Sequence, residues 1–434
     1  MSTLLRLATA GSVDDGKSTL VGRLLYDSKS VLVDQLESVE RVSRDRGLEH
    51  ADLALLTDGL RAEREQGITI DVAYRYFATA KRTFILADCP GHVQYTRNTV
   101  TGASTAHVVV LLLDARKGLL EQTRRHLAVA SLLRVPHVVV AVNKIDLVGY
   151  SQDRYDELDA EVRAVAAELG VEGISTIPVS ALVGDNIVDR SVHTPWYEGP
   201  SLLELLEELP GDPTPEEGSF RFPVQTVIRP QGAAAPQFVD YRGYAGQVAQ
   251  GVVRVGDAVT VLPSGATSTI IGIDTFDGPL EEAFAPQSVT LRLSHDLDVT
   301  RGDLLSSSHD APNPTRTIHG TLAWLAERPA VPGARVLIKH TTHVVQGVLR
   351  DIHSRLNLDT AHHEPADSLT LNDIGHVTLR VAADLAVEDY LDSRHIGSFL
   401  VIDPASGYTL AAGMVGDALE AKIDPASRPS QYSI

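Results

Sequence analysis

The stretch GSVDDGKSTL at residues 11–20 constrains the fold of this chain more than any other part of its sequence. Two glycines separated by four residues and followed by lysine and serine have the spacing of a phosphate-binding loop. Such a loop joins a buried strand to a helix. Here the apolar run LLRLATA at 4–10 precedes it, and a helical pattern follows at 17–26. Backbone N–H groups of the loop surround a phosphate, and the helix N-terminus adds partial positive charge. The stretch therefore predicts a nucleotide-binding α/β domain.

The use of lysine in this chain points to the same loop. Only seven of the 38 Lys and Arg residues are lysines, so arginine serves wherever a generic positive charge suffices. A retained lysine is then more informative, because the two side chains differ in size and in donor geometry. We expect Lys17 to reach the β- and γ-phosphates and the Ser18 hydroxyl to bind Mg²⁺.

The first 210 residues alternate apolar runs with amphipathic segments. We expect strands at 71–80, 82–89, 107–115 and 137–146, and helices at about 119–134 and 151–169. The runs HVVVLLLDA and HVVVAVNKID are almost continuously apolar, which is typical of strands buried on both faces of a parallel sheet. The pattern indicates a doubly wound α/β domain with a mostly parallel sheet.

The pattern changes after GDPTPEEGS at 211–219, a linker rich in proline, glycine and acidic residues. Short β-branched runs, separated by Gly, Pro and Asp turns, then predict two small β-barrels. We expect a nucleotide-binding domain at 1–212, β-barrel domains at 218–312 and 315–418, and a C-terminal tail at 419–434.

A second motif, DCPGH at 88–92, ends one of the predicted strands. Asp88 is placed to hold Mg²⁺ through a water molecule, and Gly91 can offer its backbone N–H to the γ-phosphate. By itself this pentapeptide is equally consistent with an ordinary turn.

A third motif, NKID at 143–146, closes another buried strand. Asp146 offers two acceptors to the N1–H and N2–H₂ donors of guanine, which adenine does not have. Asn143 can contact the base and brace the loop, while the stem of Lys144 can lie over the base plane. The sequence SAL at 180–182 ends a fourth apolar strand, where a backbone N–H can contact guanine O6. Together the four motifs predict GTP, rather than ATP, at the strand ends of one sheet.

The loop before the second strand ends in EREQGITID and supplies further candidates. Thr69 is the natural second hydroxyl ligand of Mg²⁺, in a loop that orders around the γ-phosphate and is released after hydrolysis. His92 follows the γ-phosphate glycine and is the candidate catalytic residue, orienting the attacking water. Val13 and Ile68 flank that position and can gate the approach of His92, although apolar residues there can also simply pack.

These motifs define a full set of candidate site residues. The predicted nucleotide-binding residues are Gly11, Ser12, Val13, Asp14, Asp15, Gly16, Lys17, Ser18, Thr19, Asp88, Cys89, Pro90, Gly91, His92, Asn143, Lys144, Asp146, Ser180, Ala181 and Leu182. The predicted Mg²⁺ ligands are Ser18, Thr69 and, through water, Asp88.

Composition argues against several kinds of partner and compartment. The formal net charge of −19 argues against a nucleic-acid surface, because phosphate contacts need clustered Lys and Arg. No apolar run approaches the roughly 18 residues that span a bilayer, and the N-terminus shows no signal-peptide pattern. The single cysteine, Cys89, cannot form an internal disulfide, which fits a reducing compartment. We expect a cytoplasmic protein without a membrane or nucleic-acid partner.

The motifs GSVDDGKSTL, GITID, DCPGH, NKID and SAL, followed by two β-barrels, resemble the translation-factor superfamily of GTPases. The stretch at 67–126 is similar, more specifically, to the GTPase subunit of bacterial sulfate adenylyltransferase. Its segment QYTRN at 94–98 discriminates best, because elongation factors differ after the Gly-His pair. The likeness continues more thinly through GSFLVID at 397–403 and covers nearly the whole chain. Cys89 stands where that family commonly has Thr, and Val93 follows His92; neither departure removes a phosphate or base contact.

This resemblance implies a partner. In that family the GTPase forms a heterodimer or higher complex with a catalytic subunit of the ATP-pyrophosphatase type, which joins ATP and sulfate to give adenylyl sulfate and pyrophosphate. Some members carry a fused adenylyl-sulfate kinase. The sequence shows no second GxxxxGK[ST] loop for such a kinase, and the resemblance leaves open whether a separate adenylyl-sulfate kinase joins the complex. Two alternatives remain: an elongation factor that delivers aminoacyl-tRNA, and a regulatory GTPase that switches a partner.

Overall fold

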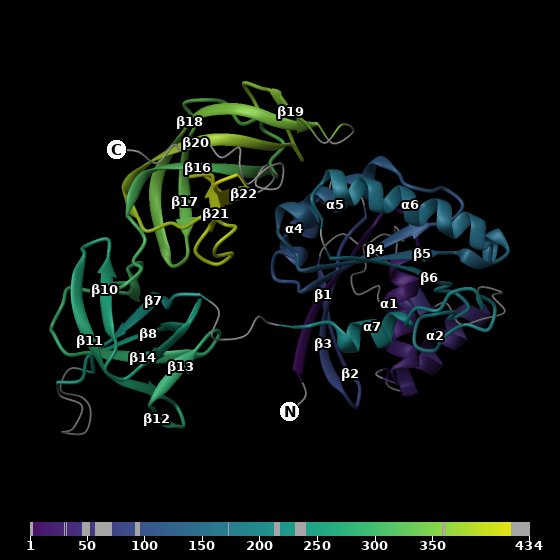
Figure 1. The fold of residues 1–434 in the computed structure, drawn as a ribbon, viewed down its shortest axis with the longest axis horizontal. Coiled ribbons are helices and arrows are strands. Elements are labelled where there is room, and N and C mark those ends of the chain that lie inside the picture. The colour runs from purple at the N-terminus through teal and green to yellow at the C-terminus, as the bar shows by residue number, and fades with distance from the viewer. Residues whose placement is uncertain are drawn as a thin grey trace. The chain divides into compact units, whose positions relative to one another are not determined.

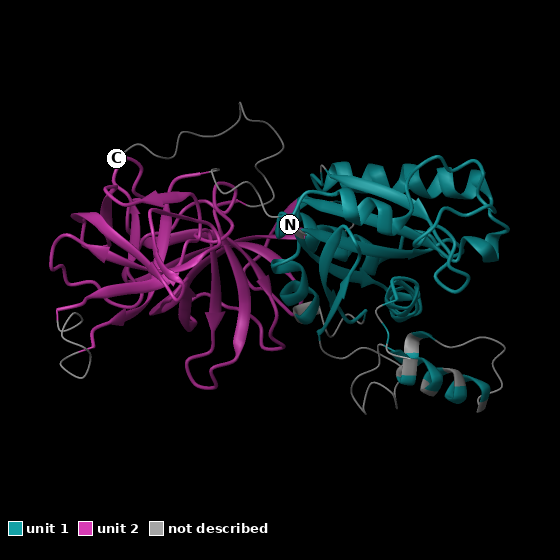
Figure 2. Ribbon diagram, turned by 90° about the horizontal axis from the view of Figure 1, so that it is seen from below, with its two compact units in different colours: residues 1–212, 357–362 teal, residues 213–356, 363–434 magenta. Residues whose placement is uncertain are grey.

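A computed structural model of the chain describes residues 3–29, 31, 33–45, 53–56, 72–91, 96–171, 173–211, 218–230, 240–357, 360 and 362–417. It divides into two compact units, which are coloured separately in Figure 2. Unit 1 comprises residues 1–212 and 357–362, and unit 2 comprises residues 213–356 and 363–434. Within the described part of the chain, no helix is both long and apolar enough to cross a membrane.

Unit 1 is built on a six-stranded sheet with the order β2-β3-β1-β4-β5-β6. Its strands are β1 (Thr3–Gly11), β2 (Ala73–Ala78), β3 (Arg82–Asp88), β4 (Val108–Asp114), β5 (His137–Asn143) and β6 (Ile174–Pro178). All neighbours pair in parallel except β2, which runs antiparallel to β3 at the edge. Every residue of β4 is buried, as the near-continuous apolar run predicts.

Helices cover both faces of this sheet (Figure 1). The helices of unit 1 are α1 (Lys17–Asp27), α2 (Val33–Asp45), α4 (Thr96–Ser104), α5 (Glu121–Leu132), α6 (Gln152–Glu168) and α7 (Leu202–Glu208), with short 3-10 helices η1 (Leu53–Leu56) and η3 (Ile145–Val148). Figure 1 shows α4, α5 and α6 on one face and α1 and α7 on the other. The predicted doubly wound α/β architecture is confirmed.

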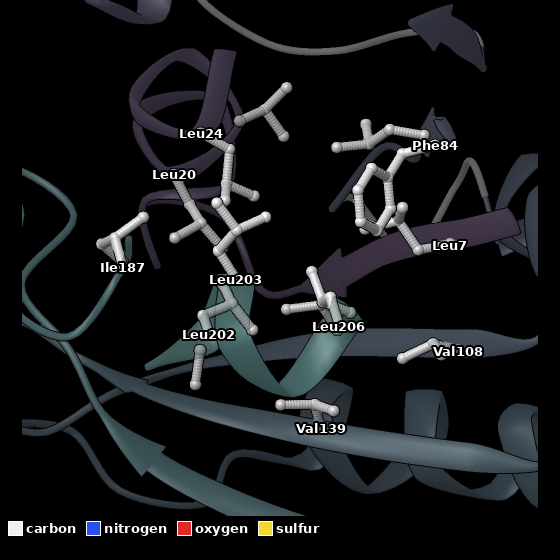
Figure 3. Close-up of a cluster of buried hydrophobic side chains, with 14 of the residues drawn as sticks. Leu7, Leu20, Leu24, Phe84, Val108, Val139, Ile187, Leu202, Leu203 and Leu206 are labelled. Atoms are coloured by element: carbon white, nitrogen blue, oxygen red, sulfur yellow. The ribbon is translucent and has the colours of Figure 1, made fainter. Parts of the chain in front are cut away.

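The apolar faces of α1 and α7 form one core with the sheet (Figure 3). Leu20 and Leu24 of α1, together with Leu202 and Leu206 of α7, have no exposed surface and pack over strand residues such as Val108. Burying each of these leucines contributes about 1.5–3 kcal/mol relative to leaving it exposed. This core fixes α1, and therefore the phosphate loop at its N-terminus, against the ends of the strands.

Unit 2 contains the two predicted β-barrels. The first consists of β7 (Arg221–Ile228), β8 (Gly243–Gln247), β10 (Ala258–Leu262), β11 (Ala266–Thr275), β12 (Gly278–Leu280), β14 (Ser288–Leu293) and β15 (Leu304–Ser307). The order β10-β15-β7-β8-β14-β11-β12 is closed by an additional β10–β11 pairing. A separate pair joins β9 (Val252–Arg254) to β13 (Glu282–Phe284). Closure gives β10 a partner on both sides, which removes a free sheet edge of the kind on which chains aggregate.

The second barrel follows the same principle. Its strands are β16 (Thr315–Trp324), β17 (Arg335–His340), β18 (His343–Asn357), β19 (His362–Pro365), β20 (Ile374–Leu385), β21 (Ser398–Ile402) and β22 (Thr409–Val415). The order β17-β21-β22-β16-β20-β18-β19 is closed by a β17–β18 pairing. Each barrel has its own apolar core.

Candidate nucleotide site

The phosphate loop adopts backbone conformations that require its two glycines. Gly11 and Gly16 have φ values of 145° and 94°, and Asp14 between them has φ 66°. A Cβ atom on Gly11 would lie 2.9 Å from the carbonyl oxygen of Leu112, and one on Gly16 would lie 2.4 Å from Nδ2 of Asn143. The spacing of glycines in the sequence thus reflects both backbone conformation and close approach.

Lys17 lies inside this loop. Its Nζ donates to the carbonyl oxygens of Gly11, at 2.9 Å, and Ser12, at 2.8 Å. Burial lowers the pKa of Lys17, and the nearby carboxylates of Asp15 and Asp88 oppose that shift. A Cβ on Gly91 would stand 2.2 Å from the same Nζ, so the two predicted γ-phosphate contacts converge.

Asp15 contributes a buried carboxylate to the phosphate loop. Its Oδ2 accepts the backbone N–H of Ser12 at 2.8 Å, whereas Oδ1 and the Ser12 hydroxyl have no hydrogen-bond partner in the described structure. Burial raises the pKa of Asp15, against the opposing effects of the Ser12 hydrogen bond and Lys17.

Asp88 ends β3 beside the phosphate loop, where β1 and β3 pair in parallel. Thr9 is its register partner and donates from Oγ1 to Oδ1 of Asp88 at 2.8 Å, with both residues buried. Thr9 thus orients the carboxylate predicted to serve Mg²⁺, and the sequence motifs did not identify it. The next residue, Cys89, is fully buried, and burial raises the pKa of its thiol far above the usual range.

Asn143 joins three loops at the predicted base-binding end of the site. Its Nδ2 donates to the carbonyl oxygen of Asp15 at 2.7 Å, and its Oδ1 accepts the backbone N–H of Ala181 at 2.9 Å. A single buried amide thereby ties the phosphate loop and the SAL segment to the end of β5. Asp146 follows on η3, half-buried beside these loops.

Lys144 takes a left-handed backbone conformation with φ 63°. Its Nζ donates to the carbonyl oxygen of Asp14 and forms an ion pair with Oδ2 of Asp114 at 3.0 Å. Asp114 ends β4 and is also held by Arg116. Sequence motifs gave no signal for Asp114, because its partner lies 30 positions away on the next strand's loop.

The SAL segment is braced from two further sides. Arg23 of α1 donates to the carbonyl oxygens of Ala181, at 3.3 Å, and Leu182. Asp185 accepts the hydroxyl of Tyr150 at 2.9 Å, which links the SAL segment to the loop that carries Asp146. Neither Arg23 nor Asp185 was predicted from the motifs.

Several predicted residues have no described placement. Thr69, Ile68 and His92 lie outside the described residues, as does the start of QYTRN. The described candidates Ser18 and Thr19 are half-buried at the start of α1, and Val13 is 36% exposed. Among the residues with described placement, no group of three or more His, Cys, Asp or Glu side chains is arranged to hold a metal ion.

Comparison with known proteins agrees with this geometry. Residues 2–211 match the family model described as the elongation factor Tu GTP binding domain, and residues 317–416 match the GTP-eEF1A C-terminal domain-like model. The "Bifunctional enzyme CysN/CysC" of Mycobacterium tuberculosis (strain CDC 1551 / Oshkosh) is 54% identical over 96% of this chain and 67% of that protein.

Two relatives carry a more specific name. "Sulfate adenylyltransferase subunit 1" of Bacteroides fragilis is 49% identical over 96% of this chain and 87% of that protein. The protein of the same name from Cellvibrio japonicus is 46% identical over 99% and 89%, respectively. These names favour the predicted resemblance over the elongation-factor alternative. The chain therefore belongs to the sulfate adenylyltransferase subunit 1 family.

Proposed function

We propose that this chain binds and hydrolyses GTP, and that hydrolysis drives the formation of adenylyl sulfate and pyrophosphate from ATP and sulfate on a separate catalytic subunit. The observation that carries the proposal is the convergence of phosphate-binding and base-reading loops at one edge of the sheet, joined through Asn143. Membership of the sulfate adenylyltransferase subunit 1 family supports the role in sulfate activation.

The phosphate end of the site suits a magnesium nucleotide. Mg²⁺ is commonly held by one or two protein oxygens together with substrate phosphates, rather than by a cage of carboxylates. The hydroxyls of Ser18 and Thr69 would provide direct ligands, and Asp88, oriented by Thr9, would hold a bound water. On nucleotide binding, the Lys17 ammonium group would exchange its hydrogen bonds to the Gly11 and Ser12 carbonyls for contacts with the β- and γ-phosphates.

The base end suits guanine. The Asp146 carboxylate would accept from N1–H and N2–H₂, Lys144 would cover the ring, and a backbone N–H of residues 180–182 would donate to O6. His92 would orient the attacking water after the γ-phosphate contact at Gly91, with Val13 and Ile68 flanking its approach.

Adenylation requires another chain. The sequence has one GxxxxGK[ST] loop, which NKID commits to GTP, and it has no SGGxDS-like pyrophosphatase stretch. We therefore propose a catalytic subunit of the ATP-pyrophosphatase type as partner in a heterodimer or larger complex. Formation of a phosphate–sulfate anhydride is thermodynamically unfavourable. GTP can therefore drive it only if the GTP-bound and GDP-bound forms of this chain bind the partner's conformations with different affinities.

The test combines reconstitution with a change of base specificity. Asp146→Asn replaces an acceptor by an amide that suits the carbonyl of xanthine. Losing a charged hydrogen bond costs about 1.5–3 kcal/mol, so GTP should bind roughly ten- to a hundred-fold more weakly. Pyrophosphate release from ATP and sulfate should require the partner and GTP with the wild-type chain, and the partner and xanthosine triphosphate with the variant.

Three results would contradict the proposal. The first is release of pyrophosphate from ATP and sulfate by this chain without a partner. The second is adenylation by the partner at a rate that does not depend on GTP. The third is an Asp146→Asn variant that keeps the response to GTP and gains none to xanthosine triphosphate. The first two reject the subunit role, and the third rejects the assignment of the base site.

A further inference from the structure

Asp114 is a buried carboxylate that the proposed chemistry does not use. It is the last residue of β4, lies opposite Asn143 in the parallel register with β5, and is 1% exposed. A buried charge of this kind is retained only with good partners, because removal from water is costly. Its partners therefore indicate what it does.

Both oxygens of Asp114 are occupied. Oδ1 accepts the backbone N–H of Arg116 at 2.9 Å and its Nε at 3.0 Å, and Oδ2 accepts the second guanidinium arm at 2.7 Å. The same Oδ2 lies 3.0 Å from Nζ of Lys144. Burial alone would raise the pKa of Asp114, but the hydrogen bonds from Arg116 and Lys144 outweigh it and lower the pKa, so the group is ionised at neutral pH.

The ammonium group of Lys144 contacts two acceptors that belong to different loops. Its Nζ contacts Asp114 after β4 and the carbonyl oxygen of Asp14 in the phosphate loop. Its backbone, at φ 63°, begins the turn into η3 that carries Asp146. With both ends fixed, the aliphatic stem is confined between the phosphate loop and the turn that carries Asp146.

We propose that Asp114 is a positioning residue that holds Lys144 over the guanine ring before nucleotide arrives and ties the base-reading loop to the phosphate loop. The inference rests on the proposed binding of GTP. A free lysine side chain has large rotamer entropy, and ordering it in advance removes that loss from the binding step. Arg116, whose side chain is 46% exposed, completes the shell of the carboxylate.

Positioning and plain electrostatics predict opposite results for Asp114→Asn. Asparagine keeps the size of the side chain and removes its charge. If Asp114 acted only as a negative charge near the phosphates, its removal would tighten binding, more for GTP than for GDP, and less at high salt. If it positions Lys144, both nucleotides should dissociate faster by the same factor, roughly ten-fold.

The experiment measures dissociation of fluorescent methylanthraniloyl GTP and GDP by stopped flow, for Asp114→Asn, Lys144→Met and the double variant. Methionine keeps an apolar stem of similar length without the anchor. We expect each single variant to dissociate both nucleotides faster by similar factors, and the double variant to be no faster than either. Asp159→Asn, which breaks the ion pair with Arg163 on α6, is the matched control and should match the wild type.

Tighter GTP binding by Asp114→Asn, or additive effects in the double variant, would overturn the proposal. Wild-type dissociation rates in Lys144→Met would also overturn it, even if Asp114→Asn did not fold. A wild-type chain that binds no guanine nucleotide would instead reject the proposed function, so the two failures are distinguishable.

Discussion

At the scale of single residues, the phosphate loop depends on one glycine for two separate reasons. Gly16 has φ 94°, and a Cβ there would lie 2.4 Å from the Asn143 amide that links three loops. Gly256, in the first barrel, has φ 99° but nothing within 4 Å of its Cβ position. Comparing alanine variants at Gly16 and Gly256 therefore separates the effect of backbone strain from the effect of displacing a neighbouring side chain.

Gly16→Ala and Gly256→Ala should both lose about 1–2 kcal/mol of stability from the left-handed backbone. Only Gly16→Ala should lose GTP affinity, by roughly ten-fold or more, because it displaces a buried hydrogen-bonding amide. Thermal unfolding and nucleotide titration of both variants make the comparison. Equal GTP affinity in the two variants would show that Asn143 can move without consequence.

A second residue-scale prediction concerns pH. His126 on α5 is buried, and burial, with smaller effects from Lys17 and Arg125, lowers its pKa to about 3. In the unfolded chain the ring takes up a proton near pH 6.5, so between these values the unfolded state binds more protons. Stability is then complete above about pH 6.5 and falls as pH decreases toward 3.

For His126 alone the loss at about pH 5 is about 2 kcal/mol. His126→Gln should flatten the fall in stability between about pH 7.5 and about pH 5 by that amount. The described helices belong to unit 1, so helical circular dichroism during urea unfolding reports this unit. An unchanged pH dependence in the variant would mean that His126 is protonated in the folded chain.

Sequence reasoning at this scale identified residues that lie in motifs and missed the residues that support them. Lys17, Gly91 and Asn143 have characteristic spacing relative to the predicted strands. Thr9 and Asp114 do not, because their partners, 79 and 30 positions away, become neighbours only when the parallel strands pair. A single sequence contains no signal for such pairs.

At the scale of elements, apolar runs predicted the central strands well. The runs at 107–115 and 137–146 correspond to β4 and β5, because strands buried on both faces need no polar alternation. The second run overshoots: β5 ends at Asn143, where Lys144 takes a left-handed conformation and residues 145–148 form η3. The NKID motif, which we propose to read the base, therefore lies mostly on a turn after the strand rather than within it.

Some elements carry a local signal in the sequence. Helix α7 begins at a capping box in which Ser201 accepts the N–H of Glu204 and the Glu204 carboxylate accepts the N–H of Ser201, a pattern visible as SLLE. Barrel closure had no such signal. The pairings β10–β11 and β17–β18 join consecutive strands, as do β7–β8 and β21–β22, but pairings such as β10–β15, β15–β7 and β22–β16 join strands that are distant in sequence.

At the scale of the whole molecule, each unit has its own apolar core and its own tryptophan. Trp196 lies in unit 1, where its Nε1 donates to the carbonyl oxygen of Tyr150 at 3.1 Å. Trp324 lies in the core of the second barrel and is 2% exposed. The chain has two tryptophans, so each reports one unit.

Nucleotide should therefore stabilise the two units unequally. A ligand at a hundred times its dissociation constant stabilises the state that binds it by about 2.7 kcal/mol, and the candidate site residues all belong to unit 1. In Trp324→Phe, the thermal transition reported by Trp196 should move upward when GTP and Mg²⁺ are added. In Trp196→Phe, the transition reported by Trp324 should stay in place. Equal shifts for both tryptophans would mean that the units unfold as one, and that the energy of nucleotide binding is shared with the barrels before any partner is present.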